Sequence, residues 1–201
     1  MDLREATDYL AKNQASMLDL TIRLANINSG SFNVAGLQQV AEILKQEFKQ
    51  LNCEQISMPV APMRMINTKG ETVELPLGPV LRCWQRPEAP VQVLLVGHMD
   101  TVFAADHKFQ TTQQLSADKL NGPGVADMKG GLVVMLWALK AFEQLPQASQ
   151  LGWEVLLNSD EEIGSPGSAE IIESRAKKHQ VGFVFEPSMD EQGTLAGERK
   201  G

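Results

Sequence analysis

The pattern of apolar positions divides the chain into helical and extended parts. Apolar residues recur at helical spacing over residues 2–27, which predicts a helix, either continuous or broken in the middle. A second helix is predicted from Asn33, a favourable N-cap, to Leu51. Residues 54–86 contain strand-like runs separated by the turn sequences NTKG and LPLGP. The chain is therefore expected to begin with helices and to continue into strands.

Three later apolar runs are predicted to be buried strands. They are VQVLLVG at 91–97, the run at 153–158 and VGFVF at 181–185. Residues 128–143 are apolar over much of the helix surface, which predicts a buried helix, and a further helix is predicted near 167–178. Continuous apolar strands that alternate with helices are typical of a mostly parallel sheet covered on both faces. The predicted fold class is therefore α/β.

Two less regular stretches complete the pattern. Residues 103–126 are predicted to be a loop with short strands, and the closing GTLAGERKG, residues 193–201, is predicted to be an edge strand. At 201 residues, the chain is expected to form one domain, or one domain with a small appendage.

Composition narrows the classes of protein to consider. A hydrophobic share of 43% is ordinary for a globular domain, and the net charge of −7 argues against a nucleic-acid partner. No apolar run approaches the roughly 20 residues that span a bilayer, and no signal peptide is recognisable. A cytoplasmic location with no membrane partner is therefore expected if Met1 is the true start. Cys53 and Cys83 are expected to be packed, reduced thiols.

Acidic residues and a histidine follow the strands that are predicted to be buried. His98 and Asp100 follow the first strand, Asp160–Glu162 follow the second, and Glu186 follows the third. Asp127 lies between the glycine-rich NGPGV and a predicted helix. In parallel sheets, ligands bind outside the carboxyl ends of the strands, so these side chains are expected to share one rim. A cation among them would relieve the repulsion between neighbouring carboxylates.

Each of these residues also has a simple structural explanation. His98 could be a buried histidine satisfied by hydrogen bonds, and Asp127 could be a helix N-cap. Glu161 and Glu162 could be solvated turn residues, and Glu186 could lie in a surface turn. These separate explanations do not account for the placement of all five residues on one predicted rim.

Histidine and carboxylate ligands without cysteine suit zinc, with cobalt or manganese as alternatives. Asp100, two residues after His98, is placed to orient the imidazole ring. Two metal ions about 3.5–4 Å apart would need a bridging carboxylate, which leaves one glutamate of the adjacent pair as a general base. His107 and His179 are expected to be exposed and to take no part.

Four motifs carry a resemblance to a known family. VGHMDTVF, GPGVADMKGG, NSDEEIGSPGS and FEPS resemble, in order and spacing, motifs of a family of di-zinc metallopeptidases. This family includes carboxypeptidase G, acetylornithine deacetylase, succinyl-diaminopimelate desuccinylase and aminoacylase. The resemblance spans about residues 15–201, and its wording is most similar to the glutamate-carboxypeptidase branch.

The resemblance implies a role for each candidate residue. It implies two zinc ions per active site, bridged by Asp127, and these metal ligands: His98, Asp127, Glu162 and Glu186. His98 and Glu186 would bind one zinc ion, and Glu162 would bind the other. Glu161 would be the general base, and Asp100 would orient His98. The resemblance also implies a cis peptide between Asp127 and Met128.

The resemblance also implies a reaction. Family members cleave an amide bond next to a free carboxylate, in a C-terminal peptide bond or an N-acyl amino acid. The expected function is therefore that of a zinc-dependent carboxypeptidase of the glutamate-carboxypeptidase kind, acting on small peptides or N-acyl amino acids. An N-acyl amino acid deacylase of the same family is the alternative.

The length of the chain departs from the family pattern. Family members continue into an inserted lid domain, often the dimer interface, and then return to the catalytic domain for a last histidine ligand. Residues 1–201 are therefore expected to be the N-terminal part of the catalytic domain, with the lid absent and little activity alone. The full-length form is expected to be a homodimer. A truncated, inactive metal-binding domain that acts by association is the alternative from another class.

Overall fold

The first part of the chain is helical, as predicted. The computed structural model describes residues 1–188, 190 and 193–194. Helices α1 (Leu3–Lys12) and α2 (Gln14–Ala25) meet at Asn13, so the predicted helix is broken in the middle. Helix α3 (Val34–Lys49) follows, and the Asn33 side chain accepts a hydrogen bond from the backbone N–H of Gly36. The predicted N-cap is therefore confirmed.

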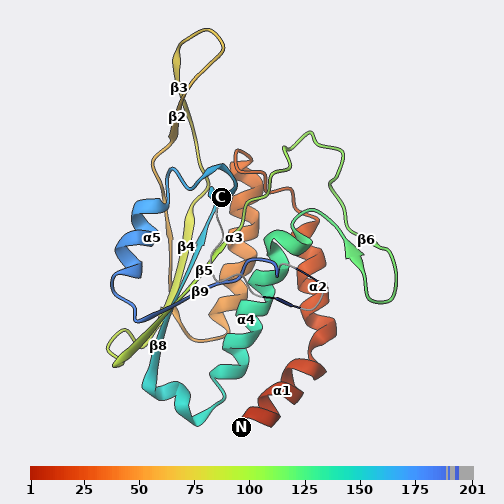
Figure 1. Cartoon of the computed structure of the whole chain (residues 1–201), viewed down its shortest axis with the longest axis vertical. Coiled ribbons are helices and arrows are strands. Elements are labelled where there is room, and N and C mark those ends of the chain that lie inside the picture. The colour runs from red at the N-terminus through yellow and green to blue at the C-terminus, as the bar shows by residue number, and fades with distance from the viewer. Residues whose placement is uncertain (189, 191–192, 195–201) are drawn as a thin grey trace.

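A five-stranded sheet in the order β1-β4-β8-β5-β9 forms the centre of the described chain (Figure 1). Its strands are β1 (Glu54–Met58), β4 (Val80–Gln85), β5 (Val91–His98), β8 (Leu151–Asn158) and β9 (Val181–Val184). Strand β5 pairs in parallel with β8 and β9, whereas β4 pairs antiparallel with β1 and β8. The α/β class is confirmed, and the strands that carry the candidate residues form the parallel part of this mixed sheet.

Two small hairpins lie outside the central sheet. Strands β2 (Met63–Ile66) and β3 (Thr72–Leu75) form a hairpin that projects from the body at the top of Figure 1. Strands β6 (Gln113–Gln114) and β7 (Leu120–Asn121) form the second, in the predicted loop with short strands.

The remaining helical elements connect the strands. They are η1 (Val125–Lys129), α4 (Gly130–Phe142), η2 (Pro146–Gln150), η3 (Glu161–Ile163) and α5 (Ala169–Ala176). None of the helices in the described part of the chain combines the length and apolar character that a membrane span requires.

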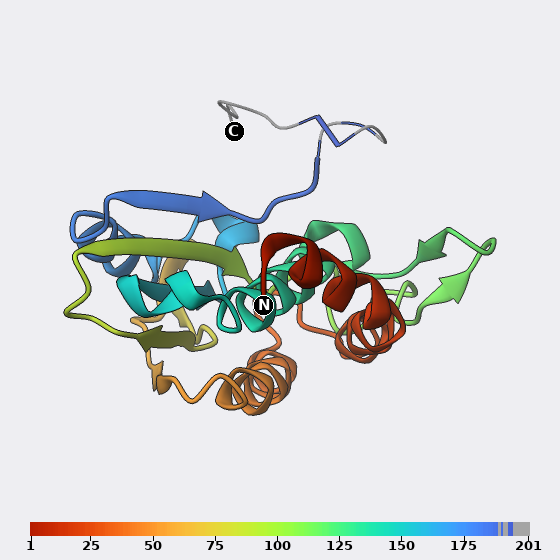
Figure 2. The same cartoon turned by 90° about the horizontal axis from the view of Figure 1, so that it is seen from below.

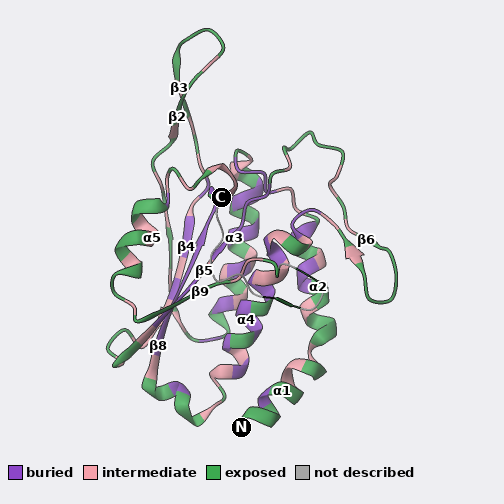
Figure 3. Cartoon of the chain, in the orientation of Figure 1, coloured by how far each residue is buried: buried purple, intermediate pink, exposed green. Residues whose placement is uncertain are grey.

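Helices cover both faces of the sheet because successive strand side chains point to opposite faces. Val155 and Leu157 of β8 belong to a large buried cluster with residues of α2, α3 and α4. Leu156, between them, belongs to a smaller cluster against which Ile171 and Ile172 of α5 pack. Figure 2 shows this layered arrangement from below, and Figure 3 shows the buried residues gathered in the central strands and the facing helices. The predicted covering of both faces is confirmed.

The prediction that the third apolar run is a buried strand is wrong. All four residues of β9 are exposed, with Phe183 53% and Val184 64% exposed. Among the described strands, β9 pairs only with β5 and lies at the edge of the sheet. Apolar composition does not distinguish an edge strand from a central one. Of the predicted edge strand at 193–201, only residues 193–194 are described, and they are not in a strand; the rest lies outside the described residues.

The predictions for the cysteines are confirmed, and one histidine prediction is wrong. Cys83 is a buried free thiol, and Cys53 is a half-buried one that packs against the same core. His107 is exposed, but the side chain of His179 is only 4% exposed. Its Nδ1 lies 2.7 Å from the carbonyl oxygen of Arg175 and its Nε2 lies 3.8 Å from Glu154. The polar sequence around His179 did not reveal this contact with the sheet.

Candidate metal centre and active site

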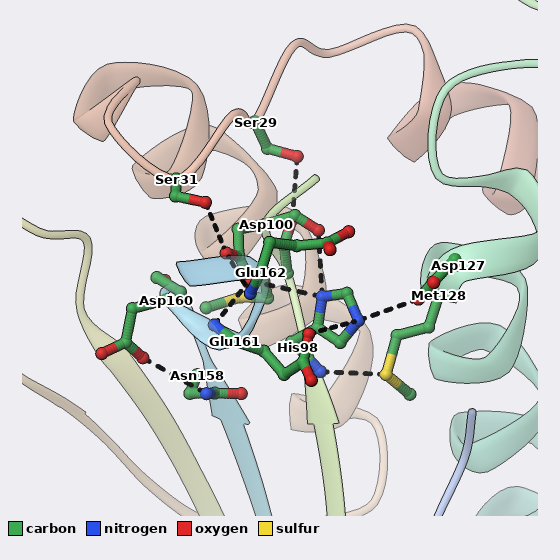
Figure 4. Close-up of polar contacts among 12 residues, drawn as sticks. Ser29, Ser31, His98, Asp100, Asp127, Met128, Asn158, Asp160, Glu161 and Glu162 are labelled. Carbon is green, nitrogen blue, oxygen red and sulfur yellow. Dashed lines mark hydrogen bonds and ion pairs between the residues drawn. The ribbon is translucent and has the colours of Figure 1, made fainter. Parts of the chain in front are cut away.

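The residues singled out in the sequence lie together at the carboxyl ends of the parallel strands. His98 ends β5, and Asp100 follows it; Glu161 and Glu162 begin η3 after β8. Asp127 lies in η1, before α4. Figure 4 shows these side chains gathered around the His98 imidazole. The predicted common rim is confirmed as an arrangement in space.

The His98 imidazole is the geometric centre of this group. Its Nε2 lies 3.0 Å from Asp127 Oδ1, 3.7 Å from Glu161 Oε2 and 3.8 Å from Glu186 Oε1. His98, Asp127 and Glu162 each offer one ligand atom, and these atoms lie within 4.8 Å of one another. Glu186 does not belong to that mutual set, although it contacts the same imidazole nitrogen.

Asp100 holds both the imidazole and the turn that carries the two glutamates. Its Oδ1 lies 3.3 Å from His98 Nδ1, which also lies 3.0 Å from the Asp100 carbonyl oxygen. The backbone N–H groups of Glu161 and Glu162 donate to the Asp100 carboxylate at 3.2 and 3.1 Å. The Ser31 hydroxyl donates to the same carboxylate at 2.7 Å. Asp100 therefore fixes more of the site than the ring orientation that the sequence suggested.

Asp160 anchors the loop that follows the two glutamates. This buried carboxylate accepts hydrogen bonds from the backbone N–H groups of Gly167 at 2.7 Å and Ser168 at 3.1 Å. The Ser168 hydroxyl and the Asn158 amide also donate to it. Buried polar groups need such partners, so the loop is tied to the end of β8 at several points. Asp160 was visible in the sequence as part of the acidic run, but nothing there indicated this structural role.

The segment around Asp127 is fixed by a buried lysine. Lys129 is fully buried, and its Nζ donates to the carbonyl oxygens of Leu24 at 3.0 Å and Ile27 at 2.9 Å. Burial lowers the pKa of Lys129 to about 8. The Asp127–Met128 peptide is cis, as the motif implied. Lys129 therefore links the end of α2 to the turn that presents Asp127.

The acids at the rim shift one another's proton affinities. Burial, with the charges of Asp127 and Asp100, raises the pKa of Glu162 to about 7. Burial also raises the pKa of Glu186, and Asp127 adds to this rise. For His98, burial lowers the pKa, but the hydrogen bond and charge of Asp100 and the neighbouring acids outweigh it and raise the pKa to about 9. A cation among these groups would relieve the repulsion between the carboxylates.

The donor set fits a divalent metal ion. One imidazole nitrogen and several carboxylate oxygens converge, and these are ligand types that zinc accepts. The other imidazole nitrogen faces the carboxylate of Asp100. A carboxylate in this position is a common partner of a metal-ligating histidine. The arrangement can therefore hold a metal ion with Glu161 beside it.

The fold and this site define a metallopeptidase-type hydrolase domain. Residues 94–199, more than half of the chain, match the family described as Peptidase family M20/M25/M40. The chain belongs to this family of peptidases. The resemblance carried by the four motifs is therefore confirmed.

Named relatives match the chain over part of their own length. Carboxypeptidase G2 from Pseudomonas sp. (strain RS-16) is 29% identical over 187 residues, which cover 93% of this chain and 41% of that protein. Succinyl-diaminopimelate desuccinylase 2 from Shewanella loihica is 33% identical over 116 residues, covering 52% of this chain and 30% of that protein. The chain thus spans less than half the length of these relatives.

Solved structures share the fold at low sequence identity. Human carnosine dipeptidase 1 has a TM-score of 0.73 and 18% identity, covering 91% of this chain and 41% of that one. The M20 family metallo-carboxypeptidase Sso-CP2 from Sulfolobus solfataricus has a TM-score of 0.62 and 19% identity, covering 88% of this chain and 38% of that one. At these identities the comparison establishes the fold alone.

Proposed function

We propose that the chain carries most of the metal centre of a zinc-dependent amide hydrolase that acts as a carboxypeptidase. The observation that carries this proposal is the convergence of His98, Asp127 and Glu162, with ligand atoms within 4.8 Å of one another at the carboxyl ends of the strands. Residues 1–201 would form the N-terminal part of the catalytic domain, which agrees with their coverage of 41% of carboxypeptidase G2. The lid domain and a last histidine ligand would then come from outside these residues.

In this proposal four side chains would hold two metal ions. His98 and Glu186 would hold one ion, Glu162 would hold the other, and Asp127 would contribute to both. When bound, zinc polarises the carbonyl oxygen of the scissile amide and makes a water molecule more acidic. His98 Nε2 lies 3.0 Å from Asp127 Oδ1 and 3.8 Å from Glu186 Oε1. These short distances support the grouping.

Glu161 moves the proton in the proposed reaction. Its Oε2 lies 3.7 Å from His98 Nε2, and its side chain is 47% exposed, so it can reach both the site and an incoming substrate. The carboxylate accepts a proton from the attacking water and returns it to the leaving amine nitrogen. Asp100 keeps the proton of His98 on Nδ1, which leaves the Nε2 lone pair available for a metal ion. Asp100 also positions the backbone of Glu161.

The carboxypeptidase reading is favoured by coverage, because the match to carboxypeptidase G2 extends over 93% of the chain. A deacylase of N-acyl amino acids is the second candidate, favoured by 33% identity to a succinyl-diaminopimelate desuccinylase over 116 residues. The substrate would be a small peptide or an N-acyl amino acid in either case.

A homodimeric full-length form belongs to the same proposal and rests on the family resemblance. The free thiols Cys53 and Cys83 suit a reducing compartment such as the cytoplasm.

Metal content tests the proposal directly. The purified and dialysed protein is expected to retain about one zinc ion per chain by elemental analysis, because the last ligand of the second ion would lie outside these residues. His98→Ala should lose it, whereas His107→Ala, which changes an exposed histidine outside the site, should retain it. Zinc that is absent from the unaltered protein, or that survives His98→Ala, would contradict the metal centre.

Catalysis is tested in a full-length form that includes the last histidine ligand. The 201-residue chain alone should hydrolyse an N-acylglutamate little or not at all, and a full-length form should hydrolyse it readily. Glu161→Gln in that form should retain zinc and lose turnover. Equal turnover with and without the Glu161 carboxylate would remove it from the role of general base. No turnover by the full-length form would favour an inactive binding domain.

A further inference from the structure

A cavity of about 410 Å³ adjoins the metal centre and shares one of its side chains. Glu162 forms part of its wall, next to Ile163. The other lining residues come from the segment around Phe32 and from the segment that contains Val102 and Ala104. If the scissile amide of a substrate lies at the proposed metal ligands, the group next to that amide can therefore enter this cavity.

The walls are held in place before any ligand arrives. Thr101 donates its backbone N–H to the carbonyl oxygen of Ser29 at 3.0 Å. The Asn28 amide donates to the carbonyl oxygens of Phe103 and Ala104 at 3.0 and 3.1 Å. A side chain at Gly30 would put a Cβ only 2.4 Å from the Phe103 carbonyl oxygen, so the close approach of these two segments requires glycine there. The cavity is thus a preformed one.

The described residues that line the cavity include no cation. Among them Glu162 is the one ionisable side chain, and there is no lysine, arginine or histidine. The Ser31 hydroxyl already donates to Asp100 at 2.7 Å, and the Asn33 amide already bonds with Asn28 and Gly36. A carboxylate placed in this cavity would lose its hydration without a cation from the described lining residues to offset that cost.

The lining does offer apolar surface. Phe32 is 49% exposed and Val102 is 68% exposed, and Ile163 and the two alanines at 104–105 line the same cavity. Burial of such surface against an apolar group of a ligand is favourable in proportion to the area removed from water. The chemistry of the walls therefore selects for an uncharged and largely apolar group.

We propose that this cavity, formed by Phe32, Val102, Ala104, Ala105, Ile163 and Glu162, binds an uncharged, apolar group next to the scissile amide. The inference rests on the proposed function, because it needs a metal ion at His98, Asp127 and Glu162 to place the amide. It narrows the substrate class: an acyl or side-chain group that ends in a carboxylate, such as a succinyl group, is disfavoured in this cavity. The free carboxylate of the substrate then binds elsewhere.

The test uses two metal-chelating probes of equal shape. The zinc-loaded 201-residue protein is titrated by calorimetry with 4-methylpentanohydroxamic acid and with the monohydroxamate of succinic acid, which replaces the isopropyl end by a carboxylate. The apolar probe is expected to bind about tenfold more tightly. Val102→Lys should reduce this preference about fivefold, because it adds a cation at the cavity. Val134→Lys, at a 51% exposed valine on α4, should leave the preference unchanged.

Each outcome separates the inference from the function on which it rests. If zinc is retained by the unaltered protein and lost by His98→Ala, the metal centre stands independently of the probes. Equal binding of the two probes, tighter binding of the succinyl probe, or no effect of Val102→Lys then overturns the cavity assignment alone. Failure of the unaltered protein to retain zinc removes the metal centre and the cavity assignment together.

Discussion

The hydroxyl of Ser31 donates to the carboxylate of Asp100 over 2.7 Å, in a part of the protein that is closed to solvent. This contact joins the segment after α2 to the rim of the sheet, 69 residues further along the chain. The same carboxylate accepts the backbone N–H groups of Glu161 and Glu162. A residue outside all four recognised motifs therefore sets the position of the Asp100 carboxylate, on which the proposed metal ligands and the proposed base depend.

Ser31→Ala is expected to weaken zinc binding without removing a ligand. Loss of a hydrogen bond to a buried charged group costs about 1.5–3 kcal/mol, and loss of an outer partner typically lowers metal affinity about 10–100-fold. Competition with a chromogenic chelator measures this affinity. Ser31→Thr, which keeps the hydroxyl, should restore most of it, and Ser174→Ala, at an exposed serine on α5, should have no effect. An unchanged zinc affinity in Ser31→Ala would show that Asp100 does not need this contact.

Asp160→Asn is expected to reduce both stability and zinc retention. An amide cannot accept all the hydrogen bonds that the Asp160 carboxylate receives from Gly167, Ser168 and Asn158, and each buried group left unpaired costs about 1–3 kcal/mol. Urea denaturation of the apo protein measures the first effect, and elemental analysis measures the second. Asp106→Asn, at an exposed aspartate, is the matched control. Normal zinc content in a clearly destabilised Asp160→Asn would confine its role to folding.

The sequence predicted the elements in which apolar residues recur at a clear spacing or dominate the composition. The helical start of the chain, the Asn33 cap and the buried strands β5 and β8 follow from local patterns of apolar and polar residues, whereas the break at Asn13 was left open. The shared rim followed from the rule that parallel strands end at one edge. These features depend on residues that are close together in the sequence or on a general rule of topology.

The features that were missed depend on contacts between distant segments. Ser31 meets Asp100, and Lys129 meets the end of α2, and neither pairing leaves a signal in the local pattern. The burial of His179 depends on Glu154, in a strand that precedes it by 25 residues; its polar neighbours suggested exposure. The exposure of β9 follows from its place at the edge of the sheet, which an apolar run cannot reveal.

Lys129→Met is expected to destabilise the protein and to weaken zinc binding. Methionine fills similar space, but the carbonyl oxygens of Leu24 and Ile27 at the end of α2 lose their donor, which costs about 1–3 kcal/mol. Asp127 lies two residues before Lys129, so its position should loosen as well. Thermal unfolding and chelator competition measure the two effects. Lys12→Met, at an exposed lysine in the last turn of α1, should change neither. A protein as stable as the unaltered one would contradict the anchoring role.

Glu154 forms a separate charged cluster on the face of the sheet covered by α5. Its side chain is 4% exposed and pairs with two arginines, with Arg82 Nε at 2.9 Å and with Arg175 through both of its oxygens. His179 Nε2 lies 3.8 Å away. Burial opposes ionisation of this carboxyl, but the hydrogen bonds from Arg175 and Arg82 outweigh burial and lower its pKa below the usual range for glutamate.

A lowered pKa in the folded state makes Glu154 a source of acid sensitivity. Its contribution to the free energy of unfolding is fully present above the ordinary pKa of about 4.3 for glutamate, and it is lost as the pH falls through the lower, folded-state value. Glu154→Gln should therefore destabilise the protein at pH 7, by about 3 kcal/mol, and flatten its loss of stability in acid. Urea denaturation from pH 7 to pH 3 measures both effects. Glu173→Gln, which breaks an exposed pair with Lys177, should reproduce neither. An acid response of Glu154→Gln parallel to that of the unaltered protein would assign the acid sensitivity to other carboxylates.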